Sequence, residues 1–454
     1  PFPFEYFVST RKQKGIGNSF YRMKEKQVPF HYEFGGPVGT AASVTLLPPL
    51  VMILSHWTKV GYVDIASLLQ WESLQPILIP ETNLTTLAMC GAGLMAWFGI
   101  LVGLWAILPG PTVLGTPILH APKKNDEPLR LPYKINGHLT FWVVVATLFI
   151  TRPNLNNYLF RYYDPLAWMA SFLTFLLSIY FYVGSFQPGC VLSKPGNSGN
   201  FFHDFWMGRQ LNPRLQIFGL DIDWKQFCEL RPGLIGWMLL NIACLQEQYA
   251  RIGYITPSMW LINGLQAFYV WDALYQEQAI LTTMDITTDG FGFMLVFGDM
   301  AWVPFTYSIP AKYLVYHDPH LSNPTLVAIL ALYLVGFYIF RSANGQKDVF
   351  RRNPNDPQVA HLSYLQTKRG TRLLTSGWWG TARKINYTGD YIMGLTYSLL
   401  CGFNSLVPYY YAVYFAVLLI HRSTRDDHQC HEKYGDDWIE YKRLVPYVFI
   451  PGIF

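Results

Sequence analysis

Long apolar segments alternate with polar loops along most of the chain. A helix needs roughly 20 apolar residues to cross the hydrocarbon core of a bilayer, and a few less where flanking residues reach the interface. Such segments lie at residues 37–57, 85–108, 137–150, 165–186, 232–245, 256–281, 291–315, 324–340, 390–403 and 406–420. This pattern predicts an all-α, polytopic membrane protein with about ten transmembrane helices.

Basic residues gather on one side of the predicted membrane. Residues 1–36 and the loops that follow the even-numbered spans are rich in Lys and Arg, whereas the loop between the first two spans is acidic. Cytoplasmic loops of membrane proteins carry such an excess of positive charge. We therefore expect both termini in the cytosol, with a short cytosolic segment at 1–36 and a membrane domain at 37–454.

Composition agrees with this class and excludes others. The chain is 51% hydrophobic and only 14% charged, and its net charge is +5, whereas soluble domains carry about 25% charged residues. Because the basic residues follow the topology, they do not indicate a nucleic-acid partner. The six cysteines form no C-x-x-C pair and the histidines show no ligand spacing apart from His428 and His431, so we expect no metal.

Two polar stretches near the carboxyl end, at residues 376–390 and 421–434, interrupt this apolar pattern. The first combines two Trp, two cations, an Asn-Tyr pair and an Asp. In the second, one helical stripe holds Arg422, Asp426, Cys430 and Tyr434 at intervals of four, and Gly435 then favours a helix end. We predict that the two stretches form a cofactor pocket on the cytosolic face, within residues 341–454. An ordinary interfacial helix would show the same spacing.

Two further groups of polar residues have possible chemical roles. If the span 324–340 continues as a helix, Lys347 and Arg351 project from one face and suit a phosphate; a basic face touching anionic lipid is the alternative. Carboxylates at membrane depth are costly and often line a cavity. The sequence places five of them close together: Asp272, Glu277, Asp285, Asp289 and Asp299. Tyr269 and Tyr275, on the predicted span 256–281, could donate a proton in such a cavity. Alternatively, both are packed rings without a chemical role.

Several motifs resemble the sterol reductase family, which includes sterol C-14 reductases, 7-dehydrocholesterol reductase, the C-24(28) reductases and the membrane half of the lamin B receptor. One such motif covers residues 199–214, and another covers 374–380 with 386–390. The segments 231–233, 289–293, 430–434 and 445–454 agree with the family as well. Within it, the Ser-Gly-Trp-Trp-Gly form of residues 376–380 is most similar to the C-14 reductases.

The resemblance implies an NADPH-dependent reductase with a ten-helix membrane fold. It matches eight residues to positions of the family's cofactor pocket: Lys347, Arg351, Trp379, Asn386, Tyr387, Arg422, Asp426 and Tyr434. Arg383 and Asp390 fall within the same motif, and Cys430 lies in the same helical stripe as Arg422. Lys384 departs from the family, which often has His there. The long basic amino-terminal region of the lamin B receptor is also missing.

By this resemblance, we expect reduction of the 14,15 double bond of a sterol 8,14-diene. Protonation would create a tertiary carbocation, which hydride from the nicotinamide then quenches. Asp426, Tyr269 and Tyr275 are the expected proton donors, with Asp285 and Glu277 as second choices. The sterol would enter from the bilayer among the fifth to seventh spans, in the endoplasmic reticulum of a eukaryote or the inner membrane of a bacterium.

Three alternatives stay open at this point. Reduction of another sterol double bond, such as the 7,8 bond, would use the same motifs. The carboxyl-terminal hairpin is also similar to isoprenylcysteine methyltransferases, but the paired cations expected to bind a 2′-phosphate argue against S-adenosylmethionine. A sterol receptor without enzymatic activity would be expected to lack the pocket residues, which are present here.

Overall fold

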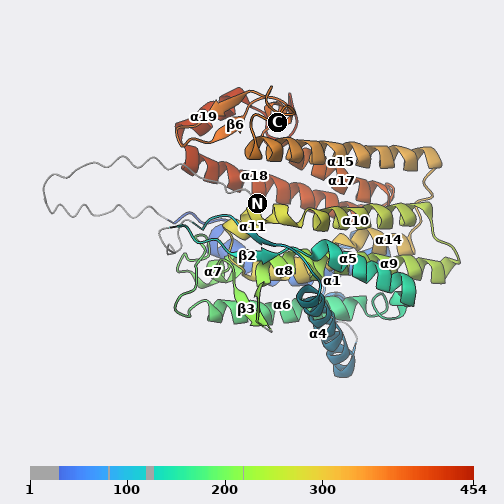
Figure 1. Cartoon of the computed structure of the whole chain (residues 1–454). Helices are drawn as coiled ribbons and strands as arrows, with labels where there is room; N and C mark the ends of the chain where they lie inside the picture. Colours follow the sequence, from blue (N-terminus) through green and yellow to red (C-terminus); the bar gives the residue numbers. More distant parts are fainter. Residues whose placement is uncertain (1–29, 80–81, 119–126, 218, 454) are drawn as a thin grey trace, which may run out of the picture. The chain divides into compact units, whose positions relative to one another are not determined.

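Two compact units divide the chain, Pro1–His31 and Tyr32–Phe454, and the second contains all the described helices and strands. The computed structural model describes residues 30–79, 82–118, 127–217 and 219–453. The predicted cytosolic segment 1–36 therefore lies mostly outside the described residues. In the second unit, most of the long helices run side by side, and α4 runs at an angle to them (Figure 1).

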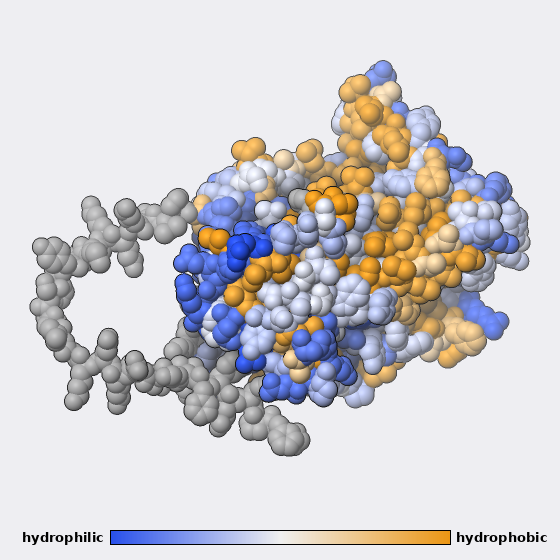
Figure 2. Space-filling view, turned by 90° about the horizontal axis from the view of Figure 1, so that it is seen from above, coloured by the Kyte–Doolittle hydropathy of each residue, from blue (hydrophilic) through white to orange (hydrophobic). Residues whose placement is uncertain are grey.

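Five helical segments of the described chain are long and apolar enough to cross a membrane. They are α1 (Gly36–Val60), α4 (Leu84–Ile107), α6 (Tyr163–Gly184), the joined α8 and α9 (Trp224–Ile252) and α15 (Asn323–Arg352). Each overlaps a span predicted from the sequence, so the chain is a polytopic helical membrane protein. Figure 2 shows hydrophobic residues gathered in a broad area between more hydrophilic ends, as lipid contact requires.

The other predicted spans correspond to helices that are shorter or broken, or, in α18, long but polar in the second half. The bounds are α5 (Gly137–Thr151), α10 (Pro257–Tyr275), α17 (Ile385–Leu399) and α18 (Tyr410–Tyr434). The predicted span 291–315 is divided into α12 (Phe293–Phe297), a π-helical turn (Gly298–Trp302), α13 (Val303–Tyr307) and α14 (Ile309–Tyr316). Pro304 and Pro310 lack the backbone N–H that a continuous helix needs, which explains the interruption.

Short elements connect these helices. Among the described residues they are α2 (Ala66–Leu69), α3 (Trp71–Leu78), α7 (Phe201–Met207), α11 (Met284–Thr287), α16 (Trp378–Thr381) and α19 (Asp436–Leu444), with 3₁₀ turns at Leu155–Asn157, Glu277–Thr282 and Val407–Tyr409. Within the joined span, α8 covers Trp224–Leu230 and α9 covers Pro232–Ile252. Three antiparallel hairpins, which the sequence analysis did not predict, pair β1 (Thr112–Leu114) with β2 (Pro132–Lys134), β3 (Arg214–Ile217) with β4 (Leu220–Asp223), and β5 (Tyr364–Gln366) with β6 (Arg372–Leu374).

Two glycines allow α15 and α17 to pack backbone against backbone. A Cβ on Gly336 would lie 2.8 Å from the carbonyl oxygen of Gly389, and a Cβ on Gly389 would lie 2.6 Å from that of Gly336. Small residues permit this approach between membrane helices. The contact fixes the first half of α17, including Asp390, beside the middle of α15.

The polar stretch 421–434 continues the helix of the last predicted span. Helix α18 runs without interruption from Tyr410 to Tyr434, and Gly435 then takes a positive φ of 55° before α19 begins. This confirms the helix and its predicted end. Helix α15 likewise extends to Arg352, which confirms that Lys347 and Arg351 lie one turn apart on a helix.

Candidate functional site

Trp379 fastens the first polar stretch to α15. Its indole Nε1 donates a 2.8 Å hydrogen bond to the carbonyl oxygen of Ala343, and its ring lies 4.0 Å from the ammonium of Lys347. The backbone N–H of Trp378 donates to Gln346 on the same helix, at 3.0 Å. These contacts bring the predicted cofactor residues of the two segments together, although they lie about thirty positions apart in the sequence.

Arg351 and Arg352 are neighbours with different surroundings. Arg352 pairs with Asp348 one turn earlier, whereas Arg351 is exposed and forms no ion pair with a described residue. A guanidinium that no carboxylate holds can bind a phosphate through paired hydrogen bonds. Arg351 is therefore available for the anion that the sequence analysis assigned to it.

Lys384 pairs with Asp426, so the residue that departs from the family contacts a predicted catalytic acid. Burial alone would raise the pKa of Asp426, but Lys384 and Lys347 hold that pKa below its usual range. Burial also raises the pKa of the Cys430 thiol, which donates to Asp426, to about 12. Asp426 is thus a charged partner of two lysines, and an ionised carboxylate is a poor proton donor.

Asn386 presents an oxygen that still lacks a donor. Its amide nitrogen donates to Asn344 Oδ1 at 3.2 Å, while its own Oδ1 is buried and accepts no hydrogen bond from a described residue. Buried polar atoms are nearly always satisfied, so an unsatisfied one indicates a missing partner. The next side chain, Tyr387, stacks on Phe449 with a centroid distance of 6.4 Å.

Arg383 holds the carboxyl-terminal segment instead of facing open space. Its Nη1 donates to the carbonyl oxygens of Val445 and Pro446, at 2.6 and 2.8 Å. Thr388 donates to the carbonyl oxygen of Phe449 at 2.7 Å. This segment therefore clamps the first turn of α17, and the geometry gives Arg383 a positioning role within the predicted pocket.

Two arginines of α18 are paired with carboxylates of the segment that follows α10. Arg422 pairs with Asp285, while Arg425 binds both oxygens of Asp289, at 2.6 and 3.0 Å, and also Glu33. Asp285 is thus held by a cation and is poorly suited to donate a proton. Arg425 carries no signal in the sequence pattern, because its partner lies 136 residues away in the chain.

Tyr434 marks the far end of the helical stripe. Its ring stacks on Trp438 of α19 with a centroid distance of 6.3 Å. Both rings belong to a small apolar cluster with Tyr441, Val445 and the β5–β6 hairpin. The predicted position of Tyr434 at one end of the pocket is therefore set by α19, which follows directly.

A hydrogen bond connects the C-terminal motif to α10. The hydroxyl of Tyr269 donates to Asp390 Oδ1 at 3.2 Å, across 121 residues of sequence. Tyr269 was predicted as a proton donor and Asp390 as a cofactor residue. The structure places these two side chains in direct contact. The contact lies where the predicted cofactor pocket meets the predicted substrate site.

Tyr275 and Glu277 lie elsewhere. Tyr275 is 59% exposed, and its ring packs against Trp271 and His138. Glu277 is 1% exposed, pairs with Arg231 at 2.7 Å and accepts from Gln226 and from the N–H of Gly137. Three donors bind the two carboxylate oxygens of Glu277, so this residue holds α5, α8 and α9 together. Its carboxylate is therefore poorly suited to donate a proton to a substrate.

Aromatic rings surround Tyr269 inside the helix bundle. The ring of Trp237, which is fully buried, lies 6.1 Å from that of Tyr269, 5.3 Å from Tyr307 and 6.4 Å from Tyr397. Tyr411 packs on both Tyr307 and Tyr397. The sequence analysis missed this cluster, because its members come from five helices and share no spacing that a single segment could show.

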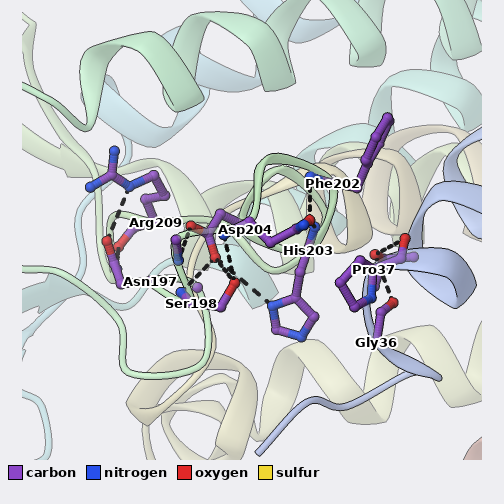
Figure 3. Close-up of polar contacts among 12 residues, drawn as sticks. Gly36, Pro37, Asn197, Ser198, Phe202, His203, Asp204 and Arg209 are labelled. Atoms are coloured by element: carbon purple, nitrogen blue, oxygen red, sulfur yellow. Dashed lines mark hydrogen bonds and ion pairs between the residues drawn. The ribbon is translucent and has the colours of Figure 1, made fainter. Parts of the chain in front are cut away.

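The other sequence motif, at residues 199–214, forms the short helix α7 and the turns on either side of it. Asp204 accepts from the N–H and the hydroxyl of Ser198 and from the N–H of Gly199 (Figure 3). Gly208 follows with a φ of 80°, and a Cβ there would lie 2.2 Å from the backbone nitrogen of Gly292. This turn therefore locks onto the segment 289–293 by direct backbone contact.

Comparison with known proteins gives consistent matches over nearly the whole chain. Residues 27–454 match the model of the "Ergosterol biosynthesis ERG4/ERG24 family". Delta(14)-sterol reductase erg24 of Schizosaccharomyces pombe is 44% identical over 94% of this chain and 99% of its own length. Delta(14)-sterol reductase TM7SF2 of Mus musculus is 42% identical over 93% of this chain and 97% of its own. Delta(14)-sterol reductase LBR of Gallus gallus is 44% identical over 92% of this chain and 63% of its own.

Proposed function

The chain belongs to the ERG4/ERG24 family of ergosterol biosynthesis, and from this premise we propose that it is an oxidoreductase that reduces the 14,15 double bond of a sterol 8,14-diene. The relatives named Delta(14)-sterol reductase support the reaction, because their similarity covers more than nine-tenths of this chain. The observation that carries the mechanism is the hydrogen bond between Tyr269 and Asp390, which joins a proton source to the cofactor motif.

We assign NADPH as the cofactor. The residues fit a nicotinamide nucleotide in three respects: Asn386 has a buried oxygen without a donor, Arg351 is free for a phosphate, and Lys347 lies one turn before Arg351. Lys347 and Arg351 would hold the 2′-phosphate, and Asn386 and Tyr387 would hold the nicotinamide half. When bound, NADPH supplies the hydride.

Tyr269 is the proton donor that we favour. An isolated double bond is not polarised for hydride attack, so a proton must be added first, which leaves a tertiary cation. Tyr269 gives its phenolic proton to the sterol, and Asp390, acting as an acid, returns one to the phenolate. Asp426 serves as a charged partner of Lys384 and of the cofactor site.

The rings around Tyr269 protect the cation. Trp237, Tyr307, Tyr397 and Tyr411 direct aromatic surface to this region, and the negative face of an aromatic ring attracts a positive charge. Their burial also excludes water, which would otherwise capture the cation. The addition of one proton and one hydride balances the reduction of one double bond.

We also propose the finer topology. Helices α1, α4, α5, α6, α9, α10, the α12–α14 segment, α15, α17 and α18 would make about ten crossings, with both termini in the cytosol and the protein in the endoplasmic reticulum membrane. Protease protection of tags at each end in sealed microsomes tests this orientation. Protection of the tag at either end would contradict it.

Product analysis tests the reaction itself. Purified protein in detergent is incubated with NADPH and an 8,14-diene in one sample, and with NADPH and a 7,8-unsaturated sterol in another. The products are identified by mass spectrometry. We expect a gain of two hydrogens at the 14,15 bond of the diene only. Reduction of the 7,8 bond instead would show that the protein reduces a different sterol double bond. Turnover without NADPH would overturn the cofactor assignment.

A further inference from the structure

An apolar cavity lies on the face of α9 opposite to Tyr269. It has a volume of about 710 Å³, is open on one side and is lined mainly by α4, α6, α9 and α13. Gly236 lines it, while the next residue, Trp237, turns its ring toward Tyr269. The cavity is therefore separate from the proposed reduction site.

A second, polar pocket of about 810 Å³ adjoins the apolar cavity. Thr86 and Tyr162 line both, so the two lie side by side. The polar pocket is built where α1 ends and α4 and α6 begin, on the side that we expect to face away from the cytosol. Together they form one site with an apolar body and a polar mouth.

The mouth is positively charged among its described residues. Lys59 and Arg161 are exposed there, and His56 lies beside them. Asp164 is the one carboxylate in the described lining, and it is already paired with Lys59 at 2.6 Å and with Lys312 at 3.1 Å. Arg161 forms no ion pair with a described residue, and its guanidinium lies 5.6 Å from the ring centroid of Tyr162. An unneutralised cation at a membrane surface attracts an anionic headgroup.

The length of the apolar body matches one leaflet. Its lining on α6 runs from Leu166 to Leu177, which is roughly 17 Å at 1.5 Å per residue. One leaflet contributes half of a hydrocarbon core about 30 Å thick, or about 15 Å. An acyl chain whose headgroup lies at the mouth would thus extend along the whole cavity.

We propose that this composite site binds an anionic phospholipid of the bilayer, with its phosphate at Arg161 and Lys59 and an acyl chain between α4 and α6. A sterol carries a single neutral hydroxyl and would leave the charge of Arg161 without an anionic partner, whereas Lys59 already has Asp164. A zwitterionic lipid would bring its own positive charge to the same mouth. The proposal does not depend on the proposed reductase activity.

Glycines of α4 provide a matched pair of variants. A Cβ at Gly93 would meet open space, and Gly93 lines the cavity, so Gly93→Leu would occupy room that an acyl chain needs. Gly99→Leu makes the same change on the same helix, also into open space, but outside the cavity lining. Arg161→Gln removes the headgroup contact, and Arg152→Gln removes an exposed cation outside the pocket lining.

Native mass spectrometry of the full chain, delipidated in detergent and then titrated, measures binding. The probes are a phosphatidylserine, a phosphatidylcholine with the same acyl chains, and a sterol. We expect phosphatidylserine to bind best. Arg161→Gln should weaken it about fivefold, as for one surface cation, and Gly93→Leu about tenfold, as for roughly two displaced methylenes. The two control variants should bind like the wild type.

Three results would overturn the proposal. They are equal binding of phosphatidylcholine, preferential binding of the sterol, and wild-type affinity for phosphatidylserine in either Gly93→Leu or Arg161→Gln. Turnover of the sterol diene, measured on the same samples, should stay unchanged in all four variants. Absence of turnover in the wild type would count against the proposed function alone and would leave the lipid-binding result intact.

Discussion

Glu277 and Asp390 are both carboxylates of the predicted membrane spans, Glu277 just after α10 and Asp390 in α17, yet their surroundings differ. Glu277 is 1% exposed and is engaged by three donors, one of them the guanidinium of Arg231. Asp390 accepts one hydrogen bond, from the phenol of Tyr269. In sequence, both look like costly charges in apolar segments. The number and kind of donors separates a carboxylate that fixes helices from one that can exchange a proton.

Tyr269→Phe tests the chemical side of this comparison and should have the largest effect. Removing the proposed donor should lower turnover of the sterol diene about 10³- to 10⁴-fold, within the range of general acid catalysis. The fold should be kept, because the one described partner of that hydroxyl is Asp390 at 3.2 Å. Tyr275→Phe, on the same helix but exposed, is the control and should turn over like the wild type. Near-normal turnover of Tyr269→Phe would exclude it as the donor.

Glu277→Ala tests the structural side. Because it leaves the buried guanidinium of Arg231 without its partner, it should lower the free energy of unfolding by about 3–5 kcal/mol. Thermal unfolding in detergent measures this loss. Glu247→Ala breaks a partly exposed pair with Arg251 and should cost less than about 1 kcal/mol. Equal losses for the two variants would show that the Arg231 pair stabilises no more than a surface contact.

Asp390→Asn decides between the two roles considered for this residue. If Asp390 returns a proton to Tyr269, kcat should fall about 10²-fold, while the Kd for NADPH measured by fluorescence stays unchanged. A weaker Kd with a normal kcat would instead make Asp390 a cofactor contact, as the sequence analysis first placed it.

Arg351→Gln tests the pocket beside this pair. Losing a charged hydrogen bond to a phosphate should raise the KM for NADPH about tenfold or more. The KM for NADH, which lacks the 2′-phosphate, should not change. Arg352→Gln is the control, since Arg352 already pairs with Asp348. A similar rise in the KM for both nucleotides would show that Arg351 does not bind the 2′-phosphate.

The smallest expected effect concerns Asp426 and pH. The folded pKa of Asp426 is lowered, so the stability that it contributes is present above its unfolded pKa of about 3.9 and is lost as pH falls through the folded value. Asp426→Asn should therefore be less stable than the wild type at pH 7, by less than about 1 kcal/mol, and the two should converge in acid. A difference that grows in acid would mean that Asp426 is protonated in the folded protein.

Local sequence patterns predicted what local forces determine. The 3.6-residue period placed Arg422 to Tyr434 on one helix, and Gly435 predicted its end, because both depend on a few neighbouring residues. The segment 291–315 was predicted as one span, but Pro304 and Pro310 interrupt its helix. The π turn at Gly298–Trp302 precedes both prolines, and sequence spacing does not predict it.

Partners in the site could not be predicted, because the contacts are long-range. Lys384 was noted only as a departure from the family, yet it holds Asp426. Arg425 was overlooked although it binds Asp289, and Tyr269 and Asp390 were assigned separate roles. In each case the two side chains come from segments far apart in the chain, so neither the helical period nor the loop charges report the contact.

The clamp that residues 445–449 place on α17 has a consequence for biosynthesis. Thr388 and its acceptor at Phe449 are 61 positions apart, so a ribosome that adds about 5–20 residues per second makes the second roughly 3–12 s after the first. During that interval, α17 is completed without its clamp. The cofactor motif would thus be the last part of the protein to mature, and a nascent chain stalled in this window would be inserted in the membrane yet inactive.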